Sequence, residues 1–282
     1  MDRPTVLSIA GSDSGGGAGI QADLAAFAYF GTFGTTAITA ITAQNPHGVR
    51  GVYPVDPAGV GAQIDAVFDG FSVAAVKTGM LFSAALIGQV AESLRRHRPR
   101  WLVVDPVMVA TSGAKLLQDD AVAALRSELL PLASVITPNL PETAVLLGRP
   151  VVGDAEALAA AAELAARHPG GWILVKGGHG HSGRSVDVLA HDDGMWVLSA
   201  PRQAAPTTHG TGCSLSAAMA ACLAHGDAPL AAVRRAKAYV LGRLRTCAAV
   251  GPGTWAMVPP LDLPLSEIAV TECRPPRQES AP

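Results

Sequence analysis

The chain has 282 residues, 49% of them hydrophobic, and its 21 Lys and Arg against 23 Asp and Glu leave a net charge of −2. This length allows one large α/β domain or two small ones. The near-neutral charge argues against a basic surface for nucleic acid or anionic membranes. No apolar run reaches the length of a membrane span, and the N-terminus lacks the pattern of a signal peptide.

The cysteines indicate the redox compartment. There are four of them, Cys213, Cys222, Cys247 and Cys273, which is too few for a disulfide scaffold. No CxxC pair occurs, so a zinc site is not expected. We therefore expect a cytoplasmic protein with reduced thiols that binds neither nucleic acid nor membrane.

In chain order, the first half alternates short β-type runs with helical patterns. Strands are predicted over residues 6–10, 35–45, 71–80, 101–108 and 133–139. Helices are predicted between them, over residues 20–30, 57–70, 84–97 and 119–130. The basic run RRHRPR (95–100) closes one of these helices, and a solvated helix end explains it more simply than a binding patch does.

The second half continues the alternation and then ends in a polar tail. Helices are predicted over 141–147, 154–167, 213–225 and 228–248, a strand over 171–178, and a hairpin over 185–200 that turns at Asp192-Asp193-Gly194. The last dozen residues, TECRPPRQESAP, have a disordered composition. We assign residues 1–268 to a single domain and residues 269–282 to a disordered tail.

Continuous apolar strands between helices predict an α/β fold, with a mostly parallel central sheet covered by helices on both faces. Open sheets of this kind bind ligands at the carboxyl ends of their strands. Unusual residues do follow the predicted strands: the GSDSGGGAG loop (11–19), Gln44-Asn45, Thr78-Gly79-Met80, Asp105-Pro106, Pro138-Asn139 and Lys176-Gly177-Gly178.

The first glycine loop, GSDSGGGAG, matches no nucleotide motif. Gly11 and Gly16 have the spacing of a P-loop, but Gly17-Ala18 stands where Lys-Ser/Thr is required. A GxGxxG fingerprint counted from Gly15 fails because its sixth position is Ile20. A ligand loop and a plain tight turn explain this segment equally well.

The second glycine loop, HGTGC (209–213), leads directly into a predicted helix. Its glycines free the backbone to turn N–H groups toward one point, and the helix adds its positive end. This arrangement suits a phosphate, or the charge that develops during phosphoryl transfer. A plain helix cap is the simpler alternative.

Two carboxylates and a lysine also follow strands. Asp105 and Glu142 at neighbouring strand ends would suit Mg²⁺ held largely through water, although a turn and a capping box at Asn139 would explain them separately. Lys176, beside two glycines, would meet a nucleotide phosphate, unless it is simply an exposed loop lysine.

Seven motifs in order now carry a resemblance: AGSDSGGGAGIQADL, TAQNPHGV, VKTGML, DPVMVATSG, TPNLPE, VKGGH and THGTGCSLSAA. Over roughly residues 4–250 the chain resembles the hydroxymethylpyrimidine and phosphomethylpyrimidine kinases of thiamine biosynthesis, in the ribokinase-like superfamily. Sugar kinases of that superfamily typically carry aspartate at the position of Cys213. The resemblance implies a three-layer ribokinase-like fold and an ATP- and Mg²⁺-dependent kinase of a small pyrimidine, with a homodimer as one possible assembly.

The resemblance also implies a role for individual residues. Cys213 would be the base beside the substrate hydroxyl, and Gly210, Thr211, Gly212 and Cys213 would form the anion hole. Gln44 would hydrogen-bond the aminopyrimidine, in a pocket lined by Gly11, Asp23, Met80 and Val107. Asp105 and Glu142 would organise Mg²⁺, and Lys176 would serve the nucleotide.

Cys213 is the residue on which the mechanism depends. At a helix N-terminus, with glycine N–H groups aimed at it, the thiolate is favoured and the pKa of Cys213 is predicted to fall below its usual range. A thiolate there would take the proton of the substrate hydroxyl. The alternative is a small buried residue that only packs the start of the helix.

Three other functions compete with this hypothesis. A pyridoxal kinase is the nearest, because its substrate is also a flat nitrogen heterocycle with a hydroxymethyl group. An NAD-dependent oxidoreductase would fit a parallel sheet with a glycine loop, but the failed GxGxxG counts against it. A catalytically silent ligand sensor is disfavoured by the retained glycine turn, Lys176 and both carboxylates.

Overall fold

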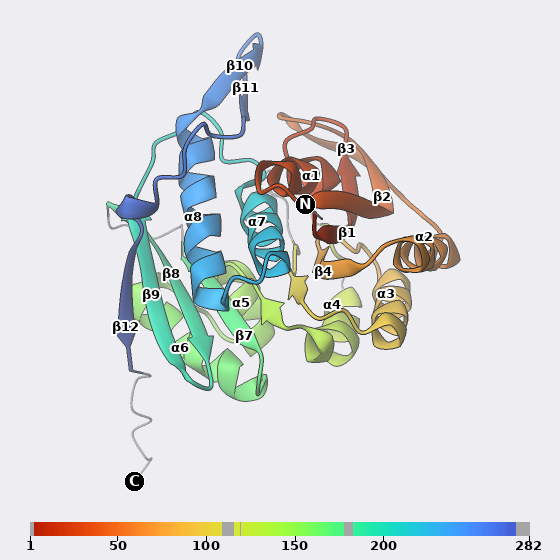
Figure 1. Ribbon diagram of the computed structural model, residues 1–282, viewed down its shortest axis with the longest axis horizontal. Coiled ribbons are helices and arrows are strands. Elements are labelled where there is room, and N and C mark those ends of the chain that lie inside the picture. The colour runs from red at the N-terminus through yellow and green to blue at the C-terminus, as the bar shows by residue number, and fades with distance from the viewer. Residues whose placement is uncertain (1–2, 109–115, 119, 178–182, 275–282) are drawn as a thin grey trace.

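A ten-stranded sheet runs through the centre of the computed structural model, which describes residues 3–108, 116–118, 120–177 and 183–274 (Figure 1). The strand order is β12-β9-β8-β7-β6-β5-β4-β1-β2-β3. The strands are β1 Thr5–Asp13, β2 Phe33–Asn45, β3 Gly48–Pro54, β4 Val73–Thr78, β5 Leu102–Val104, β6 Val135–Ile136, β7 Trp172–Gly177, β8 Arg184–His191, β9 Gly194–Pro201 and β12 Ala269–Cys273.

The middle of this sheet is parallel and its two margins are antiparallel. The pairs from β2 through β1, β4, β5 and β6 to β7 are all parallel. Strand β3 pairs antiparallel with β2 at one margin, and β8, β9 and β12 continue antiparallel from β7 at the other. The carboxyl ends of the parallel strands therefore meet along one edge of the sheet.

Helices cover both faces of the sheet. The helices are α1 Gly19–Tyr29, α2 Pro57–Gly70, α3 Ala84–His97, α4 Ala121–Ala124, α5 Leu140–Leu147, α6 Gly153–Arg167, α7 Thr211–Ala224 and α8 Pro229–Arg245. One apolar core lies under α2 to α6 and a second under α1, α7 and α8. Side chains alternate along each strand, so Val104 packs in the first core and its neighbour Val103 in the second. The predicted three-layer α/β class is confirmed.

The structure differs from the sequence prediction in four elements. The helix expected over 119–130 is short: α4 passes into a π-helical turn at Leu125–Leu129 and a 3-10 turn at Leu130–Leu132. Strand β3 was not predicted. The last predicted helix stops at Arg245, and the chain then forms a hairpin of β10 (Cys247–Gly251) and β11 (Thr254–Met257), which projects at the top of Figure 1.

The fourth difference concerns the tail. Residues 269–282 were predicted to be disordered, but Ala269–Cys273 form β12 and pair in register with β9. The pairing gives these residues backbone hydrogen bonds that their polar composition does not reveal. Residues 275–282 lie outside the described part of the chain. Among the helices of the described residues, none is both long and apolar enough to cross a membrane.

Candidate functional site

The N-terminus of α7 is the first component of the site. Gly210 precedes the helix in a left-handed conformation, with φ of 84°, and no side chain among the described residues caps the helix there. A side-chain carbon on Gly210 would lie 1.9 Å from the carbonyl oxygen of Gly17, so only glycine fits. The first-turn N–H groups of a helix have no intrahelical partner, and those of α7 thus present positive partial charge at the sheet edge.

A lysine–aspartate pair lies in front of this helix end. The Nζ atom of Lys176 is 2.8 Å from Oδ1 of Asp105, and the hydroxyl of Ser216 donates to Oδ2 at 3.1 Å. A side-chain carbon on Gly212 would lie 3.5 Å from Lys176 Nζ and 3.7 Å from Asp105 Oδ2. The structure therefore brings together Gly212, Asp105 and Lys176, as predicted from strands far apart in the sequence.

Glu142 lies beside the same pair but also serves α5. Its Oε2 accepts from the backbone N–H of Asn139 at 2.9 Å while Asn139 Oδ1 accepts from the N–H of Glu142 at 2.8 Å, which is a capping box. Its Oε1 accepts from the N–H of Met108 at 3.3 Å. Burial raises the pKa of Glu142; the charge of Lys176 opposes this rise and that of Asp105 adds to it. Glu142 therefore caps α5 and also lies close enough to Asp105 for their charges to interact.

The predicted metal ligands do not form a ready-made cage. No group of three or more His, Cys, Asp or Glu side chains that could hold a metal ion occurs within the described residues. Asp105 is engaged by Lys176 and Ser216, and Glu142 by two backbone N–H groups. Only a cation that draws most of its ligands from water and from substrate phosphates would fit this donor set.

Cys213 contradicts the pKa prediction. The thiol is half-buried, and burial raises the pKa of Cys213 above its usual range. The charge of Lys77 opposes the rise, the charges of Asp23 and Asp105 add to it, and a hydrogen bond from the N–H of Gly19 opposes it. Desolvation therefore outweighs the charge of Lys77 and the Gly19 hydrogen bond, so the neutral thiol is the favoured form.

Asp23 lies deeper than the predicted pocket wall. Its carboxylate is fully buried, accepts from Ser8 at 2.6 Å and pairs with Lys77 Nζ at 2.8 Å. All of its close polar partners are side chains of the protein, so in this structure Asp23 neutralises Lys77 beneath the site. A role for Asp23 in binding substrate directly remains a prediction that this buried position does not support.

Three of the residues predicted to line the pyrimidine pocket lie close together. Met80 clusters with Ala40 and Leu116, and Val107 and Val52 pack against them. Gly11 lies under Met80, because a side-chain carbon there would be 2.5 Å from the Met80 methyl group. Val107 has a φ of 31°, a strained value for a β-branched residue. Gly11, Met80 and Val107 are thus brought together as expected.

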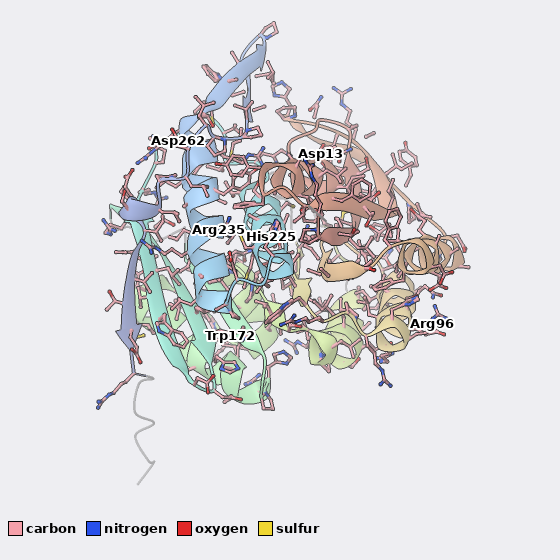
Figure 2. All side chains as sticks on the ribbon, in the orientation of Figure 1. Asp13, Arg96, Trp172, His225, Arg235 and Asp262 are labelled. Carbon is pink, nitrogen blue, oxygen red and sulfur yellow. The ribbon has the colours of Figure 1, made fainter. Side chains whose placement is uncertain are left out.

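Gln44 contacts His209, which in turn contacts Asp13, and the sequence predicted no role for either of these two residues. The Gln44 amide is 3.1 Å from Nε2 of His209, and the same ring nitrogen is 3.0 Å from Oδ2 of Asp13. Asp13 ends β1 beside α1 (Figure 2) and accepts from the N–H groups of Gly15, Gly17 and Ala18. The signal in the sequence was a histidine and an aspartate next to the two glycine loops.

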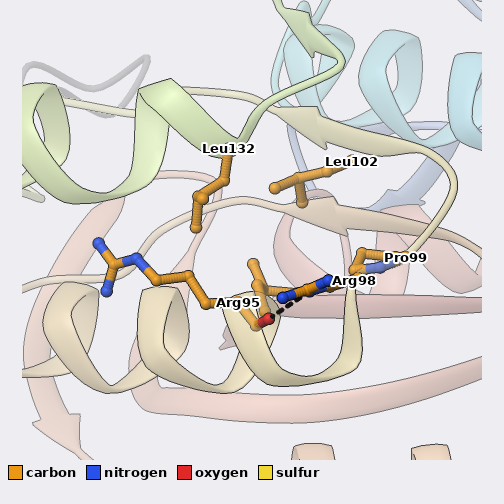
Figure 3. A pocket seen from close by; sticks show the side chains of 6 residues that line it. Arg95, Arg98, Pro99, Leu102 and Leu132 are labelled. Atoms are coloured by element: carbon orange, nitrogen blue, oxygen red, sulfur yellow. Dashed lines mark hydrogen bonds between the residues drawn. The ribbon is translucent and has the colours of Figure 1, made fainter.

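A cavity at the opposite edge of the sheet belongs to the RRHRPR run. It is lined by Leu94, Arg95, Arg98, Pro99, Leu102 and Leu132, where β5 begins (Figure 3). Arg95 donates to the carbonyl of Glu128, and Arg98 to that of Arg95. The run closes α3 as predicted, and the cavity contains no predicted site residue.

Comparison with known proteins places the chain among kinases of small pyrimidines. The family model described as phosphomethylpyrimidine kinase matches residues 13–258. A hydroxymethylpyrimidine/phosphomethylpyrimidine kinase of Rhizobium meliloti is 53% identical over 83% of the chain and 88% of its own length. A bifunctional thiamine biosynthesis protein of Geobacter sulfurreducens is 46% identical over 89% of the chain, which spans about half (51%) of that longer protein.

Solved structures give the same fold with two named activities. The ADP complex of Bacillus subtilis pyridoxal kinase aligns with a TM-score of 0.84 and 35% identity, over 91% of this chain and 97% of that one. A phosphomethylpyrimidine kinase of Clostridium difficile aligns with a TM-score of 0.75 and 39% identity, over 85% of this chain and 98% of that one.

Proposed function

Because the chain belongs to the phosphomethylpyrimidine kinase family, we propose that it transfers the γ-phosphoryl group of ATP to 4-amino-5-hydroxymethyl-2-methylpyrimidine, and then to the resulting monophosphate, in thiamine biosynthesis. The observation that carries this proposal is the open N-terminus of α7 facing the Lys176–Asp105 pair. Family membership also sets aside the NAD-dependent oxidoreductase.

The positive groups at the sheet edge have complementary roles toward the nucleotide. Lys176 is mostly buried, and burial lowers its pKa. The charges of Asp105 and Glu142 outweigh burial and raise the pKa of Lys176 above its usual value, so the ammonium group persists. A persistent cation beside a helix N-terminus suits the β- and γ-phosphates of ATP. Gly210 to Cys213 would then receive the charge that develops on the transferred group.

Cys213 is placed to handle the proton. In the step we propose, the hydroxymethyl oxygen attacks the γ-phosphorus, the bond from that phosphorus to the bridging oxygen of ADP breaks, and the hydroxyl proton passes to the Cys213 thiolate. Because burial raises the pKa of Cys213, only a minor fraction of thiolate is present at neutral pH. Phosphoryl transfer has a loose transition state, so late proton removal suffices.

Magnesium is the expected metal. Asp105 and Glu142 would hold Mg²⁺ largely through water, and the ion would neutralise the charge of the phosphates. The support is the pair of carboxylates beside Lys176, where the charge of Asp105 already acts on Glu142.

A pyridoxal kinase is the second candidate, favoured by the alignment with the Bacillus subtilis enzyme. The wall of Gly11, Met80 and Val107 would accept either flat ring. A panel of hydroxymethylpyrimidine, its monophosphate and pyridoxal, each with ATP and Mg²⁺, separates the candidates. Mono- and diphosphate products from the pyrimidine are expected; turnover of pyridoxal alone would reverse the order, and no turnover at all would favour the sensor.

Assembly and location extend the proposal. We propose a homodimer through the β2–β3 margin, where Ile41 and Tyr53 face each other across the strands and are 55% and 63% exposed. Sedimentation of the wild type and Tyr53→Glu tests this, and a monomeric wild type would contradict it.

The use of ATP and four free thiols supports a cytoplasmic location.

A further inference from the structure

The contact between Asp13, His209 and Gln44 joins the two glycine loops next to the proposed pyrimidine pocket. Oδ2 of Asp13 is 3.0 Å from His209 Nε2, and that nitrogen is 3.1 Å from the Nε2 position of Gln44. On its other side, the Oε1 position of Gln44 is 3.3 Å from Oγ1 of Thr42. These three contacts determine which atoms of Asp13, His209, Gln44 and Thr42 donate hydrogen bonds and which accept them.

Asp13 determines the state of His209. Its Oδ1 accepts from the N–H of Gly15, and its Oδ2 accepts from the N–H groups of Gly17 and Ala18, so the carboxylate is surrounded by donors. Burial raises the pKa of Asp13, but the hydrogen bonds from His209, Gly15 and Ala18 outweigh burial and lower it. An ionised carboxylate can only accept a hydrogen bond, so His209 Nε2 carries a hydrogen and donates it to Asp13.

The orientation of the Gln44 amide follows from this. A donating Nε2 of His209 cannot face the NH₂ group of Gln44, which is also a donor. Thr42 directs its one hydroxyl hydrogen toward the carbonyl of Ser12 at 2.9 Å, so the lone pairs of its oxygen face Gln44. Exchanging the oxygen and nitrogen of the amide resolves both conflicts, because Oε1 then shares the His209 N–H with Asp13 Oδ2 in a three-centre hydrogen bond and the Gln44 NH₂ donates to Thr42.

We infer that Asp13 and His209 are positioning residues that hold the Gln44 amide in this one orientation and so determine which end of it donates to the substrate. One amide N–H and one lone pair of Oε1 remain for a ligand. Such an edge matches a ring nitrogen beside an exocyclic amino group, as in a 4-aminopyrimidine. A heterocycle without that amino group would leave the oriented oxygen without its donor. This inference rests on the proposed function for the identity of the substrate.

The contact has a direct structural test that needs no substrate. In a crystal structure of the ligand-free wild type at atomic resolution, nitrogen and oxygen of the Gln44 amide are distinguishable. The nitrogen is expected toward Thr42 and the oxygen toward His209. The reverse orientation, or two equally populated orientations, would overturn the inference whether or not the protein is a pyrimidine kinase.

Kinetics test the effect on specificity. His209→Leu removes the donor and should lower kcat/KM for hydroxymethylpyrimidine about tenfold, a loss typical of one buried hydrogen bond. The KM of ATP and kcat/KM for pyridoxal should change less than about twofold. In a Gln44→Ala background, where use of the pyrimidine is already reduced, His209→Leu should have little further effect, because both substitutions remove the same interaction.

Two further variants keep the test decisive. His209→Gln retains an N–H donor at nearly the same reach and should recover most of the pyrimidine preference, and it also serves if the leucine variant does not fold. His225→Leu is the matched control: this histidine caps the other end of α7, its Nε2 lies 2.8 Å from the carbonyl of Phe30, and its loss should affect stability but not selectivity. Equal losses for pyrimidine and pyridoxal, or additive effects with Gln44→Ala, would overturn the positioning role. A wild type that does not use the pyrimidine would instead refute the proposed function.

Discussion

Two of the helices that begin at the ligand-facing edge of the sheet, α5 and α7, begin in opposite ways. At α5, Asn139 and Glu142 satisfy each other's backbone N–H groups in a capping box. At α7, Gly210 turns into the helix with no side-chain cap among the described residues. A helix end that saturates its own donors stabilises the fold, whereas one that leaves them open retains its field for an anion. The same edge of the sheet therefore contains one helix end built for stability and one built for binding.

The largest expected effect comes from closing the open end. Gly210→Ala forces a side-chain carbon against the Gly17 carbonyl and should lower kcat roughly 100-fold or more, because the turn must move relative to the substrate. Gly148→Ala is the control: Gly148 also has a left-handed φ, of 74°, but nothing lies within 4 Å of the added carbon. It should cost only about 1–2 kcal/mol of stability. Similar kcat values for the two variants would contradict the comparison.

The next effect concerns the thiol at the open end. Cys213→Ala should fold and bind substrate but lose roughly 10²–10⁴ in kcat. Because burial raises the pKa of Cys213, the wild-type kcat should increase as the pH rises toward that pKa and thiolate accumulates. Cys213→Asp, already ionised at neutral pH, should keep more activity than the alanine variant and lack this rise.

A second cysteine on α7 controls for packing. Cys222 is fully buried, its burial raises the pKa to about 12, and Cys222→Ala should leave kcat nearly unchanged. Near-wild-type turnover by Cys213→Ala would leave the base unidentified and remove Cys213 from the mechanism.

A smaller effect is expected at the capped end. Glu142→Gln keeps a capping side chain but removes one negative charge, so it should raise the Mg²⁺ concentration for half-maximal rate several-fold. Glu156→Gln is the matched control, since Glu156 is exposed and accepts from the N–H of Val152 at the start of α6. An identical Mg²⁺ dependence in all three proteins would reduce Glu142 to a capping residue.

The smallest effect tests the cap alone. Asn139→Ala should lower the free energy of unfolding by about 1 kcal/mol, as for other helix caps, and change kcat little. Asp56→Ala at the start of α2, where Asp56 Oδ1 accepts from Ala58, should cost a similar amount. Urea denaturation measures both. A loss of kcat in Asn139→Ala comparable to that of Gly210→Ala would mean that both helix ends serve catalysis.

Most of the fold could be predicted because its strands are apolar runs of the kind a buried parallel sheet requires. The margins were harder. Strand β12 contains the polar residues Thr271 and Glu272 on an exposed edge, so its sequence does not indicate a strand. It is a strand because it pairs with β9. The helix predicted over 228–248 includes the first two residues of β10, because Cys247 and Ala248 are compatible with either structure, and no strand was predicted for the rest of the β10–β11 hairpin.

The site could be predicted in part for a related reason. Asp105 and Lys176 follow strands, and the sheet brings them together whatever surrounds them. The state of Cys213 depends on desolvation by neighbours, and the sign of its pKa shift could not be read from a local motif. His209 contacts Asp13 across 196 residues, a pairing that no spacing in the sequence indicates.

The contact between Gly17 and Gly210 has a thermodynamic consequence. The loop that carries Asp13 touches the turn that begins α7, so neither loop can be displaced without the other. Ordering of one loop by its ligand then changes the free energy of binding at the other. By linkage, the factor by which the pyrimidine changes the Kd of ATP equals the factor by which ATP changes the Kd of the pyrimidine. The two substrates of this kinase are thus expected to be linked through the contacts between these loops, which are the close approach of Gly210 to Gly17 and the hydrogen bond between His209 and Asp13.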